Sequence, residues 1–105
     1  MKASIRTIAS YLSIPTLALA SLLVAGAAHA YSGENLASSA KISVAEARAI
    51  AVKTYPGKIV KTELEKEKGG SGLRYSFDIR HGKNTHEVGI DAQTGKVLEN
   101  GPDND

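Results

Sequence analysis

The alternation of apolar and polar residues between positions 73 and 91 is the feature that most constrains the fold. In the segment LRYSFDIR every second residue is apolar, and the segment THEVGID repeats the pattern. Strict alternation gives a strand one buried face and one solvated face, which is typical of an antiparallel sheet. We therefore expect a hairpin of residues 73–80 and 85–91. Its apolar face consists of Leu73, Tyr75, Phe77, Ile79, His86, Val88 and Ile90.

The turn of this hairpin lies in the tetrapeptide HGKN, and two registers are compatible with it. In the first, Gly82 and Lys83 form the turn, and Phe77 lies opposite Val88. A leading glycine suits a type II′ turn.

In the second register Lys83 and Asn84 form the turn, and Arg80 lies opposite Glu87. This arrangement pairs opposite charges, whereas the first register sets Asp78 opposite Glu87. The charge pairing slightly favours the second register.

A helix is predicted before the strands, in the segment KISVAEARAIAVKTYPG. Ser43 and Glu46 have the spacing of a capping box, in which each side chain satisfies a free backbone amide of the other residue. Ile42 precedes the cap, and Tyr55-Pro56-Gly57 ends the helix. The spacing predicts a helix over 43–55. Its narrow apolar stripe consists of Val44, Ala47, Ile50, Ala51 and Thr54.

Two further strands complete the pattern. From Lys58 the period is two, which places Val60, Thr62 and Leu64 on one face and Ile59, Lys61, Glu63 and Glu65 on the other. Gly69–Gly72 is expected to be a mobile connection to the hairpin. After the turn DAQTG, residues Val97 and Leu98 predict a short final strand. The fold class is therefore α+β, with one N-terminal helix packed on one face of an antiparallel three- to four-stranded meander sheet.

The first thirty residues are predicted to be a signal peptide. Lys2 and Arg6 precede an uncharged, mostly apolar run, which ends in the A-x-A pattern Ala28-His29-Ala30. We expect cleavage between Ala30 and Tyr31 through the general export route, because no Arg-Arg pair is present. The alternative is a retained N-terminal anchor. The predicted location is the periplasm or the medium, with no stable membrane anchoring after cleavage.

Removal of the leader changes the charge balance. Without Lys2 and Arg6, the 13 basic residues become 11, against 11 acidic residues. A formally neutral chain has no basic footprint for nucleic acid. The chain also has no cysteine, so a small exported domain must hold its core by packing alone. We divide it into a flexible lead-in at 31–41, a domain at 42–99 and an acidic tail at 100–105.

Four segments in this order resemble the PepSY family: ISVAEARAIA, VKTELEKEKGG, YSFDIR and HEVGIDAQTGKVLE. The resemblance covers about residues 42–99. It implies a module that inhibits or moderates peptidases, with a protein partner and a metallopeptidase as the candidate. Family members lack catalytic residues, so none is transferred here, and no cofactor is implied. Because the chain carries no peptidase domain, inhibition would act in trans.

His81 and His86 are weak candidates for a metal site. They would face each other across the hairpin in the second register, but a zinc site normally takes about three or four protein ligands. The nearby carboxylates of Asp78 and Glu87 fall on the opposite face. A half-exposed pair at a turn is the simpler interpretation.

The remaining candidate motifs favour structure over chemistry. The segment around Asp91 has too few acidic side chains for a calcium loop and predicts a turn. Gly69–Gly72 lacks the Lys-Ser/Thr of a phosphate loop. Ser43, Ser71 and Ser76 have no recognisable histidine–carboxylate pair, so no enzyme activity is predicted.

The charges from Lys61 to Lys68 alternate in sign, which is typical of a solvated strand protected against stray pairing. The functional alternative is an edge that accepts a partner's extended segment. The leading hypothesis is an exported, non-enzymatic binding module that moderates a peptidase, through the polar face of the sheet or the Gly69–Gly72 loop. The alternative is a small envelope protein that binds another partner or a divalent metal.

Overall fold

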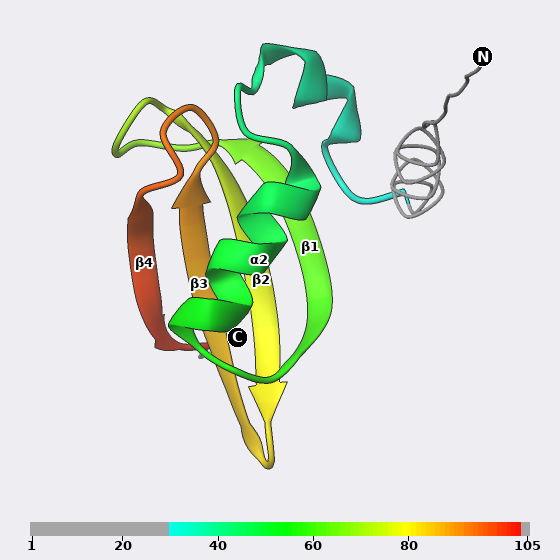
Figure 1. The fold of residues 1–105 in the computed structure, drawn as a ribbon, viewed down its shortest axis with the longest axis vertical. Coiled ribbons are helices and arrows are strands. Elements are labelled where there is room, and N and C mark those ends of the chain that lie inside the picture. Colours follow the sequence, from blue (N-terminus) through cyan, green and yellow to red (C-terminus); the bar gives the residue numbers. More distant parts are fainter. Residues whose placement is uncertain (1–29, 104–105) are drawn as a thin grey trace, which may run out of the picture.

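The computed structural model describes residues 30–103, so the predicted leader lies outside the described residues. The strands form one antiparallel sheet in the order β1-β2-β3-β4, preceded by one α-helix (Figure 1). The predicted α+β class and antiparallel meander are confirmed, and of the three to four strands expected the sheet has four. The elements are η2 (Glu34–Ser39), α2 (Val44–Thr54), β1 (Lys58–Lys66), β2 (Leu73–His81), β3 (Asn84–Asp91) and β4 (Val97–Pro102).

The helix α2 begins and ends where the sequence predicts. The Ser43 Oγ accepts a hydrogen bond from the Glu46 N–H at 3.1 Å, and the Glu46 carboxylate accepts one from the Ser43 N–H at 2.9 Å. Both bonds of the capping box are thus formed, which satisfies two amides that the first turn leaves free. Tyr55 adopts an extended conformation at the C-terminal cap, and Pro56 prevents a further turn.

The core lies between α2 and the sheet. Ala47 and Ala51 are fully buried, and the helix that carries them contacts β2 and β3 (Figure 1). Small side chains let the helix lie close to the sheet, where each large apolar side chain contributes about 1.5–3 kcal/mol on burial. The buried cluster consists of Ala47, Ala51, Leu64, Leu73, Tyr75, Phe77, Ile79, Val88, Ile90 and Ala92.

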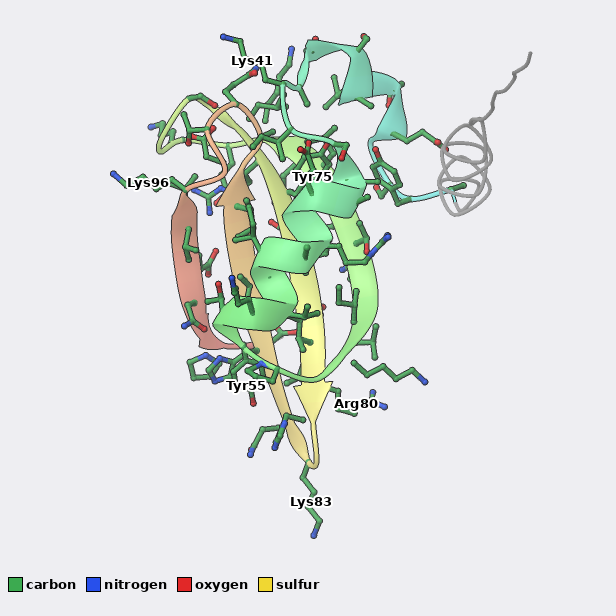
Figure 2. The ribbon with its side chains drawn as sticks, in the orientation of Figure 1. Lys41, Tyr55, Tyr75, Arg80, Lys83 and Lys96 are labelled. Carbon is green, nitrogen blue, oxygen red and sulfur yellow. The ribbon has the colours of Figure 1, made fainter. Side chains whose placement is uncertain are left out.

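Two tyrosines mark the ends of the helix (Figure 2). The Tyr75 hydroxyl donates to the carbonyl oxygen of Ile42 at 2.7 Å, which ties the start of α2 to the centre of the sheet. Burial raises the pKa of Tyr75 to about 12, so the hydroxyl stays a donor at all physiological pH values. Tyr55 occupies the opposite end of the helix.

The register of the β2–β3 hairpin differs from the one favoured by the sequence. Phe77 pairs with Val88 and His81 with Asn84, so Gly82 and Lys83 form the turn. Gly82 has φ +64°, a left-handed conformation that costs a non-glycine residue about 1 kcal/mol or more. In the alternative register, Lys83 and not Gly82 would be the first residue of the turn.

The opposite-charge pair expected from the second register is therefore not formed. Asp78 lies opposite Glu87, and Arg80 lies opposite Thr85. A cross-strand charge pair contributes only about 0.2–1 kcal/mol, which is less than a left-handed lysine costs. Turn geometry outweighs the charge pairing.

The predicted faces of β1 are wrong at its start. Ile59 pairs with Ile79 and Lys61 pairs with Asp78, so Val60 is an extra residue in a β-bulge. The bulge places Ile59 against the core and leaves Val60 43% exposed. A strict period of two predicts the reverse, with Val60 on the same face as Leu64 and Ile59 on the same face as Lys61.

Both ends of the domain extend beyond the predicted strands. Ser32, in the expected lead-in, forms a parallel bridge with Glu63, and η2 follows it. At the other end β4 continues to Pro102, and the Asp103 N–H donates to the carbonyl oxygen of Thr85 at 2.9 Å. Segments expected to be lead-in and acidic tail thus contribute backbone pairing to the sheet.

None of the helices within residues 30–103 is both long and apolar enough to cross a bilayer. The longest of them, α2, has 11 residues, against about 20 for a membrane-spanning helix.

Candidate functional site on the open face of the sheet

The face of the sheet opposite α2 gathers acidic side chains from all four strands. Successive side chains of a strand point to opposite faces, so the partners of the core residues alternate with a polar set. Cross-strand pairing places this set side by side: Lys61 with Asp78, Glu63 with Ser76, Asp78 with Glu87 and Gly89 with Glu99. We call this surface the open face. Its central part carries the carboxylates Glu63, Glu65, Asp78, Glu87 and Glu99 and the cations Lys61 and Arg74.

Arg74 is the cation at the centre of this arrangement. It is only 7% exposed, and its Nη1 lies 3.3 Å from Glu99 and 3.6 Å from Glu67. Its Nη2 donates to the carbonyl oxygen of Lys68 at 3.0 Å, while its Nε has no hydrogen-bond partner. The guanidinium therefore fastens the loop after β1 and the strand β4 to the sheet.

Gly89 makes this path possible. A Cβ at position 89 would lie 3.3 Å from Nη1 of Arg74 and 3.3 Å from the Cβ of Glu99. Such distances are tighter than ordinary contacts, so a larger residue would displace the arginine. Gly89, on the predicted polar face of β3, thus leaves the space that the Arg74 side chain occupies.

Glu87 and Asp78, on the same face, are neutralised less than Glu99, which forms an ion pair with Arg74. Burial raises the pKa of Glu87 to about 7, and the negative charges of Glu99 and Asp78 add to this effect. The pKa of Asp78 is also raised, first by burial and then by the charge of Asp103. At neutral pH Glu87 is therefore partly protonated. A cationic group placed over the open face would relieve this repulsion and release the proton.

The turn after β3 is a structural junction. Burial would raise the pKa of Asp91, but hydrogen bonds from the N–H groups of Gln93, Ser71 and Thr94 and from the Ser71 hydroxyl hold it below its ordinary value. Asp91 is 2% exposed, and both of its carboxylate oxygens accept protein hydrogen bonds. Gly95 closes the turn with φ +82° and donates to the Asp91 carbonyl. The turn predicted from the sequence is confirmed.

The same turn also receives the segment that precedes the helix. The N–H groups of Lys41 and Ile42 donate to the carbonyl oxygen of Ala92. The Gln93 side chain accepts from the Lys41 N–H at 3.1 Å and donates to the Ser39 carbonyl oxygen at 2.6 Å. Three connections of the fold therefore meet at residues 91–95.

The Gly69–Gly72 loop is packed against this junction. The Ser71 N–H and hydroxyl both donate to Asp91, at 2.7 and 2.8 Å. A Cβ on Gly70 would lie 2.9 Å from the side chain of Leu98. Because these contacts hold the loop down, the open face is the better candidate of the two surfaces considered for binding.

His81 and His86 lie beside Tyr55 at the far end of the helix. The His86 ring stacks on the Tyr55 ring with centroids 3.8 Å apart, and the His81 ring meets it edge-on at 6.1 Å. The Nδ1 of His81 lies 3.0 Å from the Pro56 carbonyl oxygen, and that of His86 lies 3.1 Å from the Asn100 side-chain oxygen.

In the observed register His86 pairs with Ile79 and not with His81. Among the side chains of residues 30–103, no group of three His, Cys, Asp or Glu has the arrangement of a metal site.

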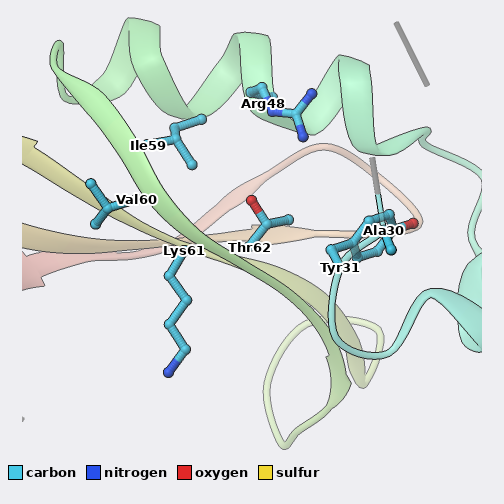
Figure 3. A pocket seen from close by; sticks show the side chains of 7 residues that line it. All are labelled: Ala30, Tyr31, Arg48, Ile59, Val60, Lys61 and Thr62. Atoms are coloured by element: carbon cyan, nitrogen blue, oxygen red, sulfur yellow. The ribbon is translucent and has the colours of Figure 1, made fainter. Parts of the chain in front are cut away.

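Sequence reasoning missed a cleft of about 530 Å³ between α2 and β1 (Figure 3). Arg48, on α2, lines this cleft together with residues of β1. The bulge at Val60 and the pairing of Ser32 with β1 shape the cleft, and neither has a local signal in the sequence. The lining residues are Ala30, Tyr31, Arg48, Ile59, Val60, Lys61 and Thr62.

The chain was compared with known proteins in three ways. Neither the search of curated proteins nor the search of solved structures found a significant match. The model of the PepSY family, described as the peptidase propeptide and YPEB domain, matches residues 41–100. This match contains α2, the strands β1 to β3, the turn at Asp91 and the first four residues of β4. The chain therefore belongs to the PepSY family.

Proposed function

We propose that the chain is exported and that the mature protein, residues 31–105, is a binding module which inhibits or moderates a peptidase in the periplasm or the medium. The observation that carries the proposal is the match of residues 41–100 to a family described by its peptidase propeptides. The partner is a protein, with a metallopeptidase as the candidate, and no cofactor takes part.

The open face is the proposed docking surface. The helix α2 covers the other face, as the burial of Ala47 and Ala51 among sheet residues supports. The open face concentrates negative charge in a chain whose mature part is formally neutral. Complementary charge on a partner speeds encounter and suppresses wrong partners. We therefore expect a cationic surface near the active-site cleft of the peptidase.

The role is proposed to be non-enzymatic. Within residues 30–103, the hydroxyl of Ser76 donates to Glu65 at 2.9 Å, and that of Ser71 donates to Asp91 at 2.8 Å. A nucleophilic serine instead needs a base that takes its proton and that is itself oriented by a third group. These carboxylates organise the sheet and its loops.

Inhibition is tested with the exported protein and a panel of secreted and periplasmic metallopeptidases from the same cell. We expect it to slow at least one enzyme at near-stoichiometric ratios. The variant Glu87→Lys should weaken that effect by about tenfold, because it reverses charge at the centre of the open face. Glu34→Lys, on η2, is the matched control.

The two parts of the proposal can fail separately. If the wild-type protein slows no enzyme of the panel, the peptidase role is wrong. If Glu87→Lys inhibits as well as the wild type, the partner binds another surface. Thermal unfolding of each variant is measured to check that its fold is retained.

A further inference from the structure

The outer edge of β1 is occupied over only part of its length. The Leu64 N–H donates to the carbonyl oxygen of Ser32 at 2.9 Å, and Ser32 forms a single parallel bridge with Glu63. Residues 30 and 31 then line the cleft beside β1 and do not extend this bridge into a strand. Among residues 30–103, no further backbone segment pairs with the outer edge of β1, so its part at residues 59–62 is open to another chain once the leader is removed.

The direction of the backbone amides follows from the Leu64 bond. Along a strand, N–H groups alternate between the two sides, so residues two apart point to the same side. Since the Leu64 N–H points away from β2, the N–H of Thr62 does so as well. An extended segment laid along this edge would continue the pairing that Ser32 begins.

The cleft beside this edge has the composition of a side-chain pocket. Its floor includes Ile59 and Tyr31, and Arg48 reaches over it from α2 (Figure 3). Among residues 30–103, no carboxylate lies within ion-pair distance of Arg48. Lys61 points to the other side of the strand and pairs with Glu63 at 3.5 Å. The cleft is thus a partly apolar site with one unused cation and no acidic lining residue.

We propose that the outer edge of β1 at Ile59–Thr62 is a strand-addition site for an extended acidic peptide segment whose carboxylate pairs with Arg48. Main-chain hydrogen bonds to an edge strand supply affinity, and pockets for alternate side chains supply specificity. The volume of about 530 Å³ accommodates such side chains. Cleavage after Ala30 would add the α-amino group of Tyr31 to the same end of the cleft, which increases the attraction for a carboxylate.

Other features of the edge make the site selective. The bulge at Val60 and the charge of Lys58 discourage pairing with a long neutral strand. The acidic open face repels the same peptide, so binding is confined to the edge. The inference rests on the proposed function in two respects: the leader is removed after Ala30, and the partner is a protein.

The test uses the exported protein and a labelled peptide of about eight residues, which is the length of a long strand. The peptide alternates valine and threonine and carries one central glutamate, and a matched peptide carries glutamine. Fluorescence anisotropy measures affinity, and backbone amide NMR shifts locate the site. We expect saturable binding, shifts at Ile59–Thr62, and affinity for the glutamate peptide about 2- to 5-fold higher, as for an exposed ion pair.

Variants separate the backbone contribution from the charge. Thr62→Pro removes the N–H that points away from β2. An edge strand tolerates proline at such a position, so the fold should be kept while binding of both peptides weakens by about tenfold. Thr62→Val keeps the backbone and should bind as the wild type does. Arg48→Gln should abolish the preference for glutamate, whereas Lys96→Gln, on the far side of the sheet, should leave it unchanged.

The proposal is overturned by absent binding at millimolar peptide, by shifts confined to β4 or the open face, or by equal affinity for the two peptides. No peptidase is present in any of these binding measurements. A failure of the inhibition assay therefore leaves this site intact, and a failure of the peptide assay leaves the peptidase role intact.

Discussion

At the scale of single residues, two buried or half-buried acids of this chain have opposite roles. Asp91 receives hydrogen bonds from two loops, which hold its pKa below the ordinary value despite burial. Glu87 is partly buried beside Asp78 and Glu99, and its pKa is raised to about 7. Donors compensate the charge of Asp91, so it stabilises the fold. The charge of Glu87 is uncompensated, so it costs stability and leaves the open face ready for a cation.

Glu87→Gln should stabilise the protein at pH 7.5 and have little effect at pH 4. The folded pKa of about 7 lies above the ordinary value of 4.5. The contribution of Glu87 is therefore fully present below about pH 4.5 and is lost as the pH rises through about 7. Partial solvent exposure limits the expected gain in the free energy of unfolding to about 1 kcal/mol. Urea unfolding at both pH values measures it, with Glu34→Gln as the control; an equal gain at both pH values would contradict the electrostatic cause.

At the scale of elements, the bulge in β1 decides which side chains enter the core. One extra residue at Val60 changes the phase of the alternation, so Ile59 packs on the helix side. Bulges are common near edges and next to binding sites. The same bulge helps to shape the cleft below Arg48. A simple period of two, read from the sequence, places both residues on the wrong faces.

Substitutions on either side of the bulge test this assignment. Ile59→Ala should lower the free energy of unfolding by about 1–2 kcal/mol, because a partly buried side chain is lost from the core. Val60→Ala should change it by less than about 0.5 kcal/mol, as at other exposed positions. Chemical denaturation measures both variants under identical conditions. A larger loss for Val60→Ala would instead support the regular alternation.

At the scale of the whole molecule, the two faces of the fold differ in charge. The open face collects carboxylates from every strand, whereas the cleft between α2 and β1 presents Arg48. Ala30 is exposed where the chain reaches this cleft, and Tyr31 is half-buried with its ring 6.5 Å from that of Tyr75. The proposed cleavage site therefore lies between an exposed residue, Ala30, and a half-buried one, Tyr31.

Mass spectrometry of the exported protein should find Tyr31 as its first residue. The small residues Ala28 and Ala30 fit the two recognition positions of the cleavage pattern. Ala30→Leu should block cleavage and leave the precursor in the membrane fraction, whereas Ala27→Leu should not. An exported protein that begins at Met1 or at another position would show that the leader assignment is wrong.

Local interactions explain what could be predicted from the sequence. The capping box at Ser43, the proline after Tyr55, the alternation from Leu73 to Ile90 and the turn at Asp91 each depend on residues close together in the chain. These signals were sufficient for the order of the helix and strands and for the fold class. The resemblance carried by the same segments led to the family.

The sequence by itself determined where α2 and the central parts of the four strands form, because propensity, capping and periodicity act over a few residues. Only the tertiary structure decided the hairpin register, the bulge at Val60, the path of Arg74 over Gly89 and the cleft at Arg48. Each of these depends on pairing between distant segments, where turn geometry and packing compete with charge. The surfaces available for binding come from that competition, so they could not be read from the chain alone.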